Sequence, residues 1–184
     1  MVLSEKIFGV VLDWSMSSKL ITRERTPALK DAHGEVLELG FGTALNLACF
    51  PDSVRRLTMV DPKLLMPKLV AERIAAAHFP VQRAKISAEH LPFEDDRFDC
   101  VVSTFTLCTI PNVTAALREA RRVLKPGGSL LFLEHGLSEE PNVAKWQRRL
   151  DPIQSVISRG CHLTRRIDQL VSDAGLEIAR LDRS

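Results

Sequence analysis

The 184-residue sequence predicts an α/β protein built on a doubly wound, mostly parallel sheet. Three observations predict this fold class. Short apolar runs, mostly rich in Val, Ile, Leu and Phe, alternate with longer segments whose apolar residues recur at helical spacing. The short runs have the composition of strands that are buried on both faces. No repeat, low-complexity tract or long Gly/Ser linker interrupts the alternation, so no internal domain boundary has compositional support.

Five of the apolar runs are expected to form strands of one sheet. In chain order they are Val36–Leu39, Leu57–Val60, Val81–Ile86, Phe98–Thr104 and Ser129–Glu134. A sixth strand is expected at Leu176–Leu181, close to the end of the chain.

Helix signals lie between these runs. Lys63–Phe79 carries apolar residues at helical spacing. Asn112 can cap a helix that extends through Leu124 and ends before Lys125-Pro126-Gly127-Gly128, which is interpreted as a helix stop and turn. Thr164 can cap a further helix through Ala174, with Gly175 at its C-terminal stop.

Composition limits the function classes. A net charge of +2 and a pI near 8.4 fall short of the concentrated basic surface that nucleic-acid binding requires, so no nucleic-acid partner is expected. The four cysteines show neither close metal-ligand pairs nor the density of a disulfide scaffold, and are interpreted as reduced thiols of a cytoplasmic protein. The apolar run Ile7–Leu12 is too short for a spanning helix and lacks the flanks of a signal peptide.

A glycine turn follows the first expected strand. Gly40-Phe41-Gly42-Thr43 leads into a helix-compatible segment, and such a strand, turn and helix can cradle an anionic ligand group on free backbone N–H groups. An ordinary tight turn is the structural alternative. Leu45 occupies the position of the third glycine of a dinucleotide fingerprint, which disfavours a pyrophosphate cofactor.

Asp61 ends the second expected strand, nineteen residues after Gly42. A carboxylate at this place can accept both hydroxyls of a ribose, which suits any adenosine-containing cofactor. Asp61 can also act as the N-cap of the helix that begins near Pro62-Lys63, and the two roles are compatible.

Five ordered motifs carry a family resemblance over roughly residues 34 to 136. They are Glu38-Leu39-Gly40-Phe41-Gly42, Asp61, Ala88-Glu89-His90-Leu91-Pro92-Phe93, Phe98-Asp99-Cys100-Val101-Val102-Ser103 and Leu124-Lys125-Pro126-Gly127-Gly128. Together they resemble the class I S-adenosylmethionine-dependent methyltransferases, in the subgroup related to ubiquinone/menaquinone-biosynthesis methyltransferases. Asp99 and the Lys125 turn are treated as scaffold markers.

The resemblance implies a Rossmann-like methyltransferase sheet of seven strands, with S-adenosylmethionine across the carboxyl ends of the first, second and fourth. Physical reasoning agrees, because ligands of open parallel sheets bind outside the carboxyl ends where strand order reverses. The implied cofactor contacts are Glu38, Gly40 and Gly42 with the methionine moiety, Asp61 with the ribose, Ala88 and Glu89 with the adenine, and Thr104 at the outlet of the fourth strand.

A narrower resemblance lies in residues 133 to 165. Leu133-Glu134-His135, Trp146-Gln147, Leu150-Asp151-Pro152 and Gly160-Cys161-His162-Leu163-Thr164-Arg165 look like the branch that includes methyltransferase-like alkyl-thiol S-methyltransferases. The favoured acceptor is therefore a small, fairly apolar molecule, an alkyl thiol first and a quinone-like phenol or an amine next. Branches of a superfamily change function by changing loops on a common scaffold. The match is therefore specific for the branch and less informative about the substrate.

The candidate catalytic residues are His135 and His162, either of which can act as a general base toward an acceptor. Cys161 can help to shape the acceptor pocket. Packing or capping is the structural alternative for the histidines, and a small buried apolar group is the alternative for the cysteine. No metal site is expected, because His90, His135, Cys161 and His162 lack a compact ligand spacing.

Two departures from the family pattern carry consequences. Ala44 stands where many relatives have another glycine, a change that is tolerated if the residue already lies in the helix. The chain ends at Ser184, so the last strand of the family fold is expected to be missing. The sixth strand would then leave an unpaired edge, through which a second copy can form a homo-oligomer.

The expected organisation is a helical lid segment at residues 1–33 and a cofactor-binding unit at residues 34–184. Trp14 and Met16 are expected on the lid helix, for which an amphipathic helix packed on the sheet is the alternative. The basic stretch Lys145–Arg149, with Trp146, can touch a membrane surface weakly, although a solvated helix face is more common.

Three function hypotheses follow. The first is methyl transfer from S-adenosylmethionine to a small-molecule acceptor. The second is an NAD-dependent oxidoreductase, which shares the sheet and Asp61 but conflicts with Leu45. The third is a noncatalytic interaction module that retains the fold, motivated by Ala44 and the position of the C-terminus.

Overall fold

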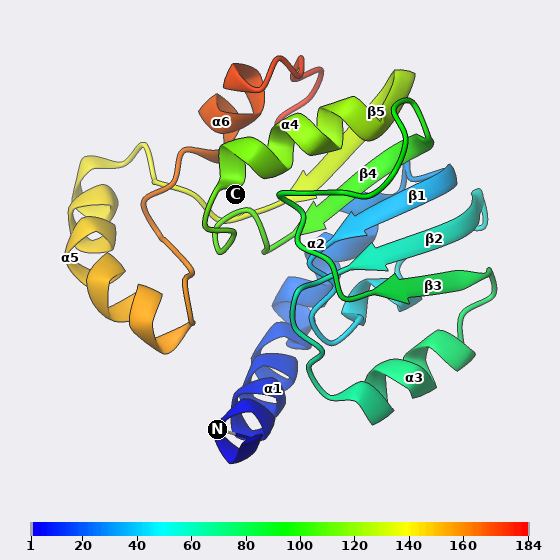
Figure 1. The fold of residues 1–184 in the computed structure, drawn as a ribbon. Helices are drawn as coiled ribbons and strands as arrows, with labels where there is room; N and C mark the ends of the chain where they lie inside the picture. The colour runs from blue at the N-terminus through cyan, green and yellow to red at the C-terminus, as the bar shows by residue number, and fades with distance from the viewer. Residues whose placement is uncertain (1, 184) are drawn as a thin grey trace.

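Five strands and the helices around them form the architecture that Figure 1 shows, in a computed structural model that describes residues 2–183. The elements are, in chain order, α1 (Val2–Met16), α2 (Lys19–Leu29), β1 (Gly34–Leu39), the 3₁₀ helix η1 (Leu45–Ala48), β2 (Val54–Val60), α3 (Pro67–Ala75), β3 (Val81–Ala84), β4 (Phe98–Thr104), α4 (Val113–Val123), β5 (Leu124–Leu133), α5 (Pro141–Ile157) and α6 (Ile167–Asp173).

The strand order is β3-β2-β1-β4-β5, and every neighbouring pair is parallel. Chain order therefore reverses between β1 and β4, which pair from Val36 with Cys100 to Leu39 with Ser103. This confirms the predicted doubly wound sheet, and all five strands cover most or all of the runs expected for them. The reversal creates the crevice in which open parallel sheets bind ligands.

Both faces of the sheet are covered. Along β1, Val36 belongs to a core cluster with Leu29 and Val70, next to α2 and α3, whereas Leu37 belongs to a second cluster with Ala116 of α4. Residues that alternate along a strand point to opposite faces, so the continuous apolar runs reflect burial on both sides. Helix α5 and the N-terminal part of α1 lie away from the sheet (Figure 1).

The helix predictions need two boundary corrections. The helix expected at Lys63–Phe79 is shorter, because Met66 has a left-handed conformation (φ 44°) and Pro67 begins α3. A proline suits the first turn of a helix but disfavours a helical residue before it. The capping predictions for α4 are confirmed, since the Asn112 side chain accepts the N–H of Ala115 at 3.1 Å.

Helix α6 begins at Ile167 and is not capped by Thr164. The preceding backbone bonds elsewhere: the Leu163 N–H donates to Asp151, and the Arg165 carbonyl accepts the N–H of Leu137 at 2.9 Å. The expected stop is confirmed, because Gly175 has a φ of +79° directly after this helix.

The sixth strand expected at Leu176–Leu181 does not form. Among the described residues, this segment pairs with no strand, and Leu176 and Ile178 instead pack against a cluster that includes Leu117 of α4 and Val171 of α6. The partial burial of these two side chains against helices takes the place of hydrogen bonding between this segment and the sheet.

Asp99 joins three strands. Its carboxylate accepts the N–H of Glu35 of β1 at 2.7 Å and a hydrogen bond from Lys125 Nζ of β5 at 2.6 Å. The expected turn at Lys125–Gly128 is a bulge within β5, because Phe98 pairs with Leu124 and the ladder resumes at Cys100 with Ser129. Asp99 holds the bulge in place from the neighbouring strand.

We expect Asp99→Ala to lower the free energy of unfolding by about 1–3 kcal/mol, because a backbone N–H and an ammonium lose their shared acceptor. Urea denaturation measures this loss. Asp173→Ala, at an exposed position of α6, is the control and should stay within about 0.5 kcal/mol of the parent. Equal effects of the two substitutions would contradict the role assigned to Asp99.

Candidate active site

The turn after β1 has the backbone of a ligand cradle. Gly40 has a φ of +70°, and a Cβ there would lie 2.2 Å from Thr106 Cγ2, so no side chain fits. Gly42 has a φ of +52°, and a Cβ there would meet nothing within 4 Å. The first glycine allows close packing, and the second leaves open space at the carboxyl end of the strand.

The segment after the turn differs from the expected helix. It forms the short 3₁₀ helix η1, and Ala44 precedes it in a left-handed conformation with a φ of 64°. The condition that Ala44 already lies in the helix is therefore not met. Such a backbone is disfavoured for residues other than glycine, and here packing maintains it, since Ala44 is buried.

Glu38 is a buried carboxyl group beside this turn. One oxygen accepts a hydrogen bond from Asn46 Nδ2 at 2.7 Å, and the other, Oε2, is buried without a partner among the described residues. Burial raises the pKa of Glu38 to about 7, although the bond from Asn46 and the charge of Arg25 act in the opposite direction. A buried oxygen without a partner beside this turn fits a ligand that donates a hydrogen bond.

Arg25 of α2 reaches the same place from the N-terminal segment. The guanidinium is buried, and its Nη1 donates to Asn46 Oδ1 at 2.6 Å and to Thr104 Oγ1 at 3.1 Å. The Thr104 side chain is thus turned into this buried network. Sequence reasoning missed Arg25 and Asn46, because neither belongs to a motif and a mostly polar helix gives no sign that one arginine is buried.

Asp61 lies at the carboxyl end of β2 and faces the glycine turn. Its Oδ2 accepts the N–H of Gly42 at 3.1 Å, and its Oδ1 accepts the N–H of Lys63 at 2.8 Å. Burial raises the pKa of Asp61 against these two bonds. Because α3 begins only at Pro67, Asp61 is not a helix N-cap; it connects two turns at the edge of the crevice.

The segment after β3 lies beside the same edge. Ala88 is buried in a cluster with Val60, the residue before Asp61. The Glu89 carboxylate accepts the N–H of Asn112 at 2.7 Å and the hydroxyl of Ser87 at 2.9 Å. Glu89 therefore ties this segment to the start of α4, and its side chain is already occupied.

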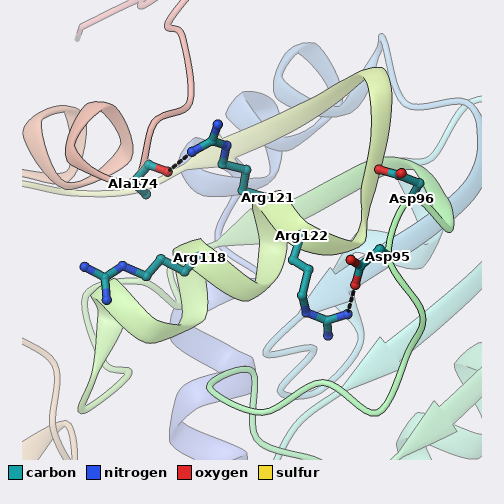
Figure 2. Close-up of a pocket in the computed structure, with 6 residues that line it drawn as sticks. All are labelled: Asp95, Asp96, Arg118, Arg121, Arg122 and Ala174. Atoms are coloured by element: carbon teal, nitrogen blue, oxygen red, sulfur yellow. Dashed lines mark hydrogen bonds and ion pairs between the residues drawn. The ribbon is translucent and has the colours of Figure 1, made fainter.

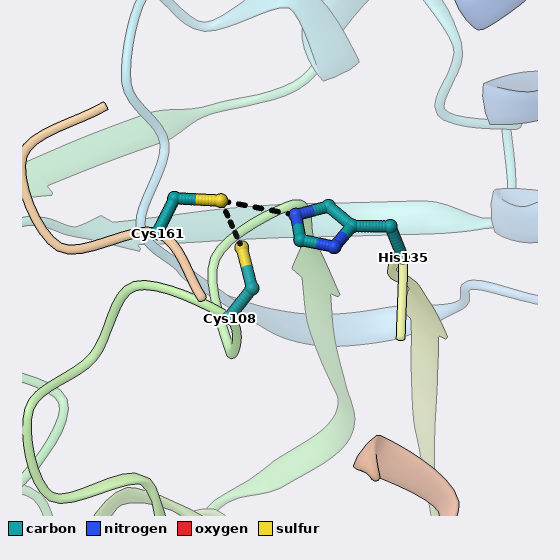
Figure 3. A group of neighbouring side chains, drawn as sticks. All are labelled: Cys108, His135 and Cys161. Atoms are coloured by element: carbon teal, nitrogen blue, oxygen red, sulfur yellow. Dashed lines mark hydrogen bonds between the residues drawn. The ribbon is translucent and has the colours of Figure 1, made fainter. Parts of the chain in front are cut away.

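A second polar group lies at the carboxyl ends of β4 and β5. Figure 3 shows the Cys108–His135–Cys161 cluster, in which His135 Nε2 lies 3.1 Å from Cys161 Sγ and the two sulfur atoms are 3.6 Å apart. The bond from the Cys108 thiol and the adjacent imidazole lower the pKa of Cys161, whereas the pKa values of Cys108 and His135 are raised by their bonds to Cys161.

His162 does not enter this cluster through its ring. Its Nδ1 pairs with Asp151 Oδ2 at 3.0 Å, while its backbone N–H donates to the Cys108 carbonyl at 3.0 Å. The structure thus brings together His135 and Cys161 of the three residues that sequence reasoning grouped. Cys108 was missed, because its partners are 27 and 53 positions away and no local spacing reports them.

Glu134 organises the backbone next to the cluster. Its Oε1 accepts the N–H groups of Thr106 and Leu107 and the hydroxyl of Ser103, while Oε2 is buried without a partner in the described part of the chain. Burial raises its pKa, opposed first by the bond from Thr106. Thr106 also donates to the Gly40 carbonyl at 3.1 Å, so one loop links the glycine turn to the cluster.

The N-terminal helices are anchored near the turn. The two nitrogens of the Arg73 guanidinium of α3 bind the Asp13 carboxylate of α1 at 2.6 and 3.2 Å, and Arg73 also donates to the Thr43 carbonyl at 2.7 Å. Trp14 is 78% exposed and does not pack on the sheet. No helix among residues 2–183 is long and apolar enough to cross a membrane.

A separate hollow of about 410 Å³ lies on α4 and the loop before β4 (Figure 2). Its charges are largely engaged, since Arg122 binds Asp95 at 2.7 Å and Arg121 donates to the Ala174 carbonyl at 3.4 Å. The loop enters β4 at its amino end, so the hollow lies away from the crevice. It supplies none of the groups described above.

Comparison with known sequences gives one family and two informative relatives. Residues 37–132 match the family model described as "Methyltransferase domain". Thiol S-methyltransferase TMT1B of Rattus norvegicus is 36% identical over 152 residues, covering 78% of this chain and 62% of the relative. Ubiquinone/menaquinone biosynthesis C-methyltransferase UbiE of Bartonella henselae is 34% identical over 149 residues, which cover 78% of this chain and 54% of the relative. The chain thus spans less than two thirds of either relative.

A solved structure shares the fold. The O-methyltransferase family protein from Burkholderia thailandensis superposes with a TM-score of 0.76 at 17% identity, over 97% of this chain and 56% of that one. At this level of identity the likeness concerns the fold alone.

We expect Glu38→Gln to change how stability depends on pH. The folded pKa of Glu38 lies near 7, above the ordinary 4.5, so between these values the folded chain keeps a proton that the unfolded chain has released. Stability therefore falls as pH rises through this window. Relative to the variant, the wild-type chain should lose on the order of 3 kcal/mol of unfolding free energy between about pH 4 and about pH 8. Denaturant titrations across this range measure it, and parallel profiles would contradict the burial of an ionisable Glu38.

Proposed function

Because this chain belongs to the methyltransferase domain family, the class I S-adenosylmethionine-dependent methyltransferases, we propose that it transfers a methyl group from S-adenosylmethionine to a small-molecule nucleophile, an alkyl thiol first. Family membership confirms the resemblance drawn from Glu38 to Gly128. The cofactor supplies an activated methyl group on a sulfonium. The protein's part is to bind and align the two reactants, which provides most of the rate in such a displacement.

The main support for the proposal is the open glycine turn after β1, where strand order reverses. It lies between two carboxyl groups, those of Glu38 and Asp61. Glu38 offers a buried oxygen without a partner, and Gly42 leaves space where a side chain would intrude. These two features fit a methionine moiety, whose ammonium donates hydrogen bonds. Asp61, at the next strand end, fits the ribose hydroxyls. Ala88 fits an apolar wall of the adenine site.

The thiol preference has two supports. A thiol S-methyltransferase is among the relatives at 36% identity. The chain also has a sulfur and imidazole cluster at the ends of β4 and β5, beside the crevice. Polarisable sulfur atoms and a partly apolar setting suit an apolar thiol better than a strongly hydrated acceptor.

A general base is proposed at His162, which Asp151 orients by a 3.0 Å contact at Nδ1. The carboxylate leaves Nε2 as the nitrogen that can accept a proton from the acceptor. His135 is already engaged with Cys161 through Nε2. It is therefore proposed to act with that sulfur as part of the acceptor site.

The N-terminal helices are proposed to form the lid of the cofactor site, supported by buried Arg25 and by the Asp13–Arg73 pair. A membrane-surface contact is proposed through α5, where Trp146 is 60% exposed and Arg149 lies 5.6 Å from its ring. A homo-oligomer through β3 or β5, the two edges of the sheet, remains a further proposal.

We predict that Asp61→Ala weakens S-adenosylmethionine binding by about 1–3 kcal/mol, because two ribose hydroxyls lose their acceptor. Gly42→Ala should also weaken it, since the added methyl enters the open cradle. Isothermal titration calorimetry measures both, with Asp52→Ala, at an exposed position of the loop before β2, as the control. Parent-like affinity in both folded variants would move the cofactor elsewhere.

We predict that labelled S-adenosylmethionine transfers its methyl group to alkyl thiols in preference to matched phenols and amines. His162→Ala should lower the rate about 100-fold or more, the effect of losing a general base. His78→Ala, on the loop before β3, serves as control. Methylation confined to phenols or amines would reject the thiol assignment, and an unchanged rate and pH profile in His162→Ala would make that residue structural.

A further inference from the structure

The Cys108–His135–Cys161 cluster has the composition and spacing of a metal site. The two thiol sulfurs and one imidazole nitrogen all lie within 4.8 Å of one another. A tetrahedral zinc ion with ordinary bond lengths holds two sulfurs about 3.8 Å apart and a sulfur and a nitrogen about 3.6 Å apart. The observed separations of 3.6 Å between the sulfurs and 3.1 Å between His135 Nε2 and Cys161 Sγ are within about half an ångström of these values.

We propose that Cys108, His135 and Cys161 bind a zinc ion, with a fourth coordination position open to the sulfur of the acceptor. Two thiolates and one imidazole are soft and intermediate ligands, which select zinc over magnesium or calcium. Two thiolates also neutralise the charge of the ion. A neutral assembly suits the place, since Cys108 is 1% and Cys161 9% exposed.

The backbone around the cluster is braced. Arg165 donates to the carbonyls of Leu107 and Ile110, which joins the loop of Cys108 to the loop of Cys161. Glu134 binds the N–H groups of Thr106 and Leu107 and immediately precedes His135. The backbone segments that carry the three ligands are therefore connected before any metal binds. Ligands held in this way lose less conformational entropy when a metal binds.

His135 Nδ1 is buried and has no partner among the described residues. When Nε2 binds a metal, Nδ1 carries the ring proton, on the side of the ring away from the ion.

The role of the fourth position rests on the proposed function. An acceptor thiol would bind there as its thiolate and release its proton to His162 or to water. Its sulfur then forms a bond to the methyl carbon as the bond from that carbon to the sulfonium breaks, which leaves a thioether and S-adenosylhomocysteine. A metal keeps the acceptor deprotonated near neutral pH while the side chains fix its position.

Metal analysis of the purified full chain tests the site without any assay of activity. We expect about one zinc per chain, and after exchange for cobalt, thiolate-to-cobalt charge-transfer absorption together with visible bands of tetrahedral intensity. Cys108→Ser and Cys161→Ser should each weaken zinc binding by more than about 100-fold, since even outer-shell partners are worth 10 to 100-fold. Cys49→Ser, outside the cluster, should bind zinc like the parent. Thermal unfolding verifies that each variant is folded.

The open position is tested with propanethiol on the cobalt protein, with propanol as the matched control. A shift of the charge-transfer band with the thiol alone supports it, and no shift overturns it. A folded wild-type chain that takes up no zinc or cobalt, or that contains a Cys108–Cys161 disulfide after purification under reducing conditions, overturns the metal site. Propanethiol methylation by metal-free protein overturns the zinc role and leaves the proposed function intact. A zinc-bound chain that methylates no acceptor rejects the function and retains the site.

Discussion

Strands β1 and β4 pair side by side, yet the chain leaves them toward opposite faces of the sheet, and the candidate site depends on this divergence. After β1 the chain enters η1, on the face that α2 and α3 cover, whereas after β4 it enters α4 on the other face. Ligands of open parallel sheets bind outside the carboxyl ends at such a point.

Two buried charged groups lie beside the glycine turn after β1, and removing them from water has a free-energy cost. Glu38 and Arg25 are both buried beside Asn46, and the arginine comes from outside the sheet unit. Buried charges are stable only where hydrogen bonds and opposite charges surround them. Each of these two groups keeps one buried polar atom without a partner among the described residues. The network thus holds hydrogen-bonding capacity that the described residues leave unused.

The adjacent ends of β4 and β5 carry different chemistry. Glu134 supports the Thr106–Leu107 backbone, and Thr106 in turn binds the Gly40 carbonyl. A single loop therefore positions both the glycine turn and Cys108. A cofactor and an acceptor bound at neighbouring strand ends would share this support, which is how a rigid sheet can align two reactants for an in-line displacement.

The sequence by itself determined the sheet and the glycine turn after β1, because these depend on local signals. Apolar runs predicted all five strands, glycines marked the turn after β1, and Asn112 marked the start of α4. The strand predicted at Leu176–Leu181 was wrong, because side chains of that segment pack on helices. The left-handed conformation of Ala44 is maintained by packing, which local sequence does not report. Only the tertiary structure decided that Arg25 is buried beside Glu38 and that Cys108 meets His135 and Cys161. Those contacts join residues far apart in the chain, and no period or motif in the sequence encodes such a distance.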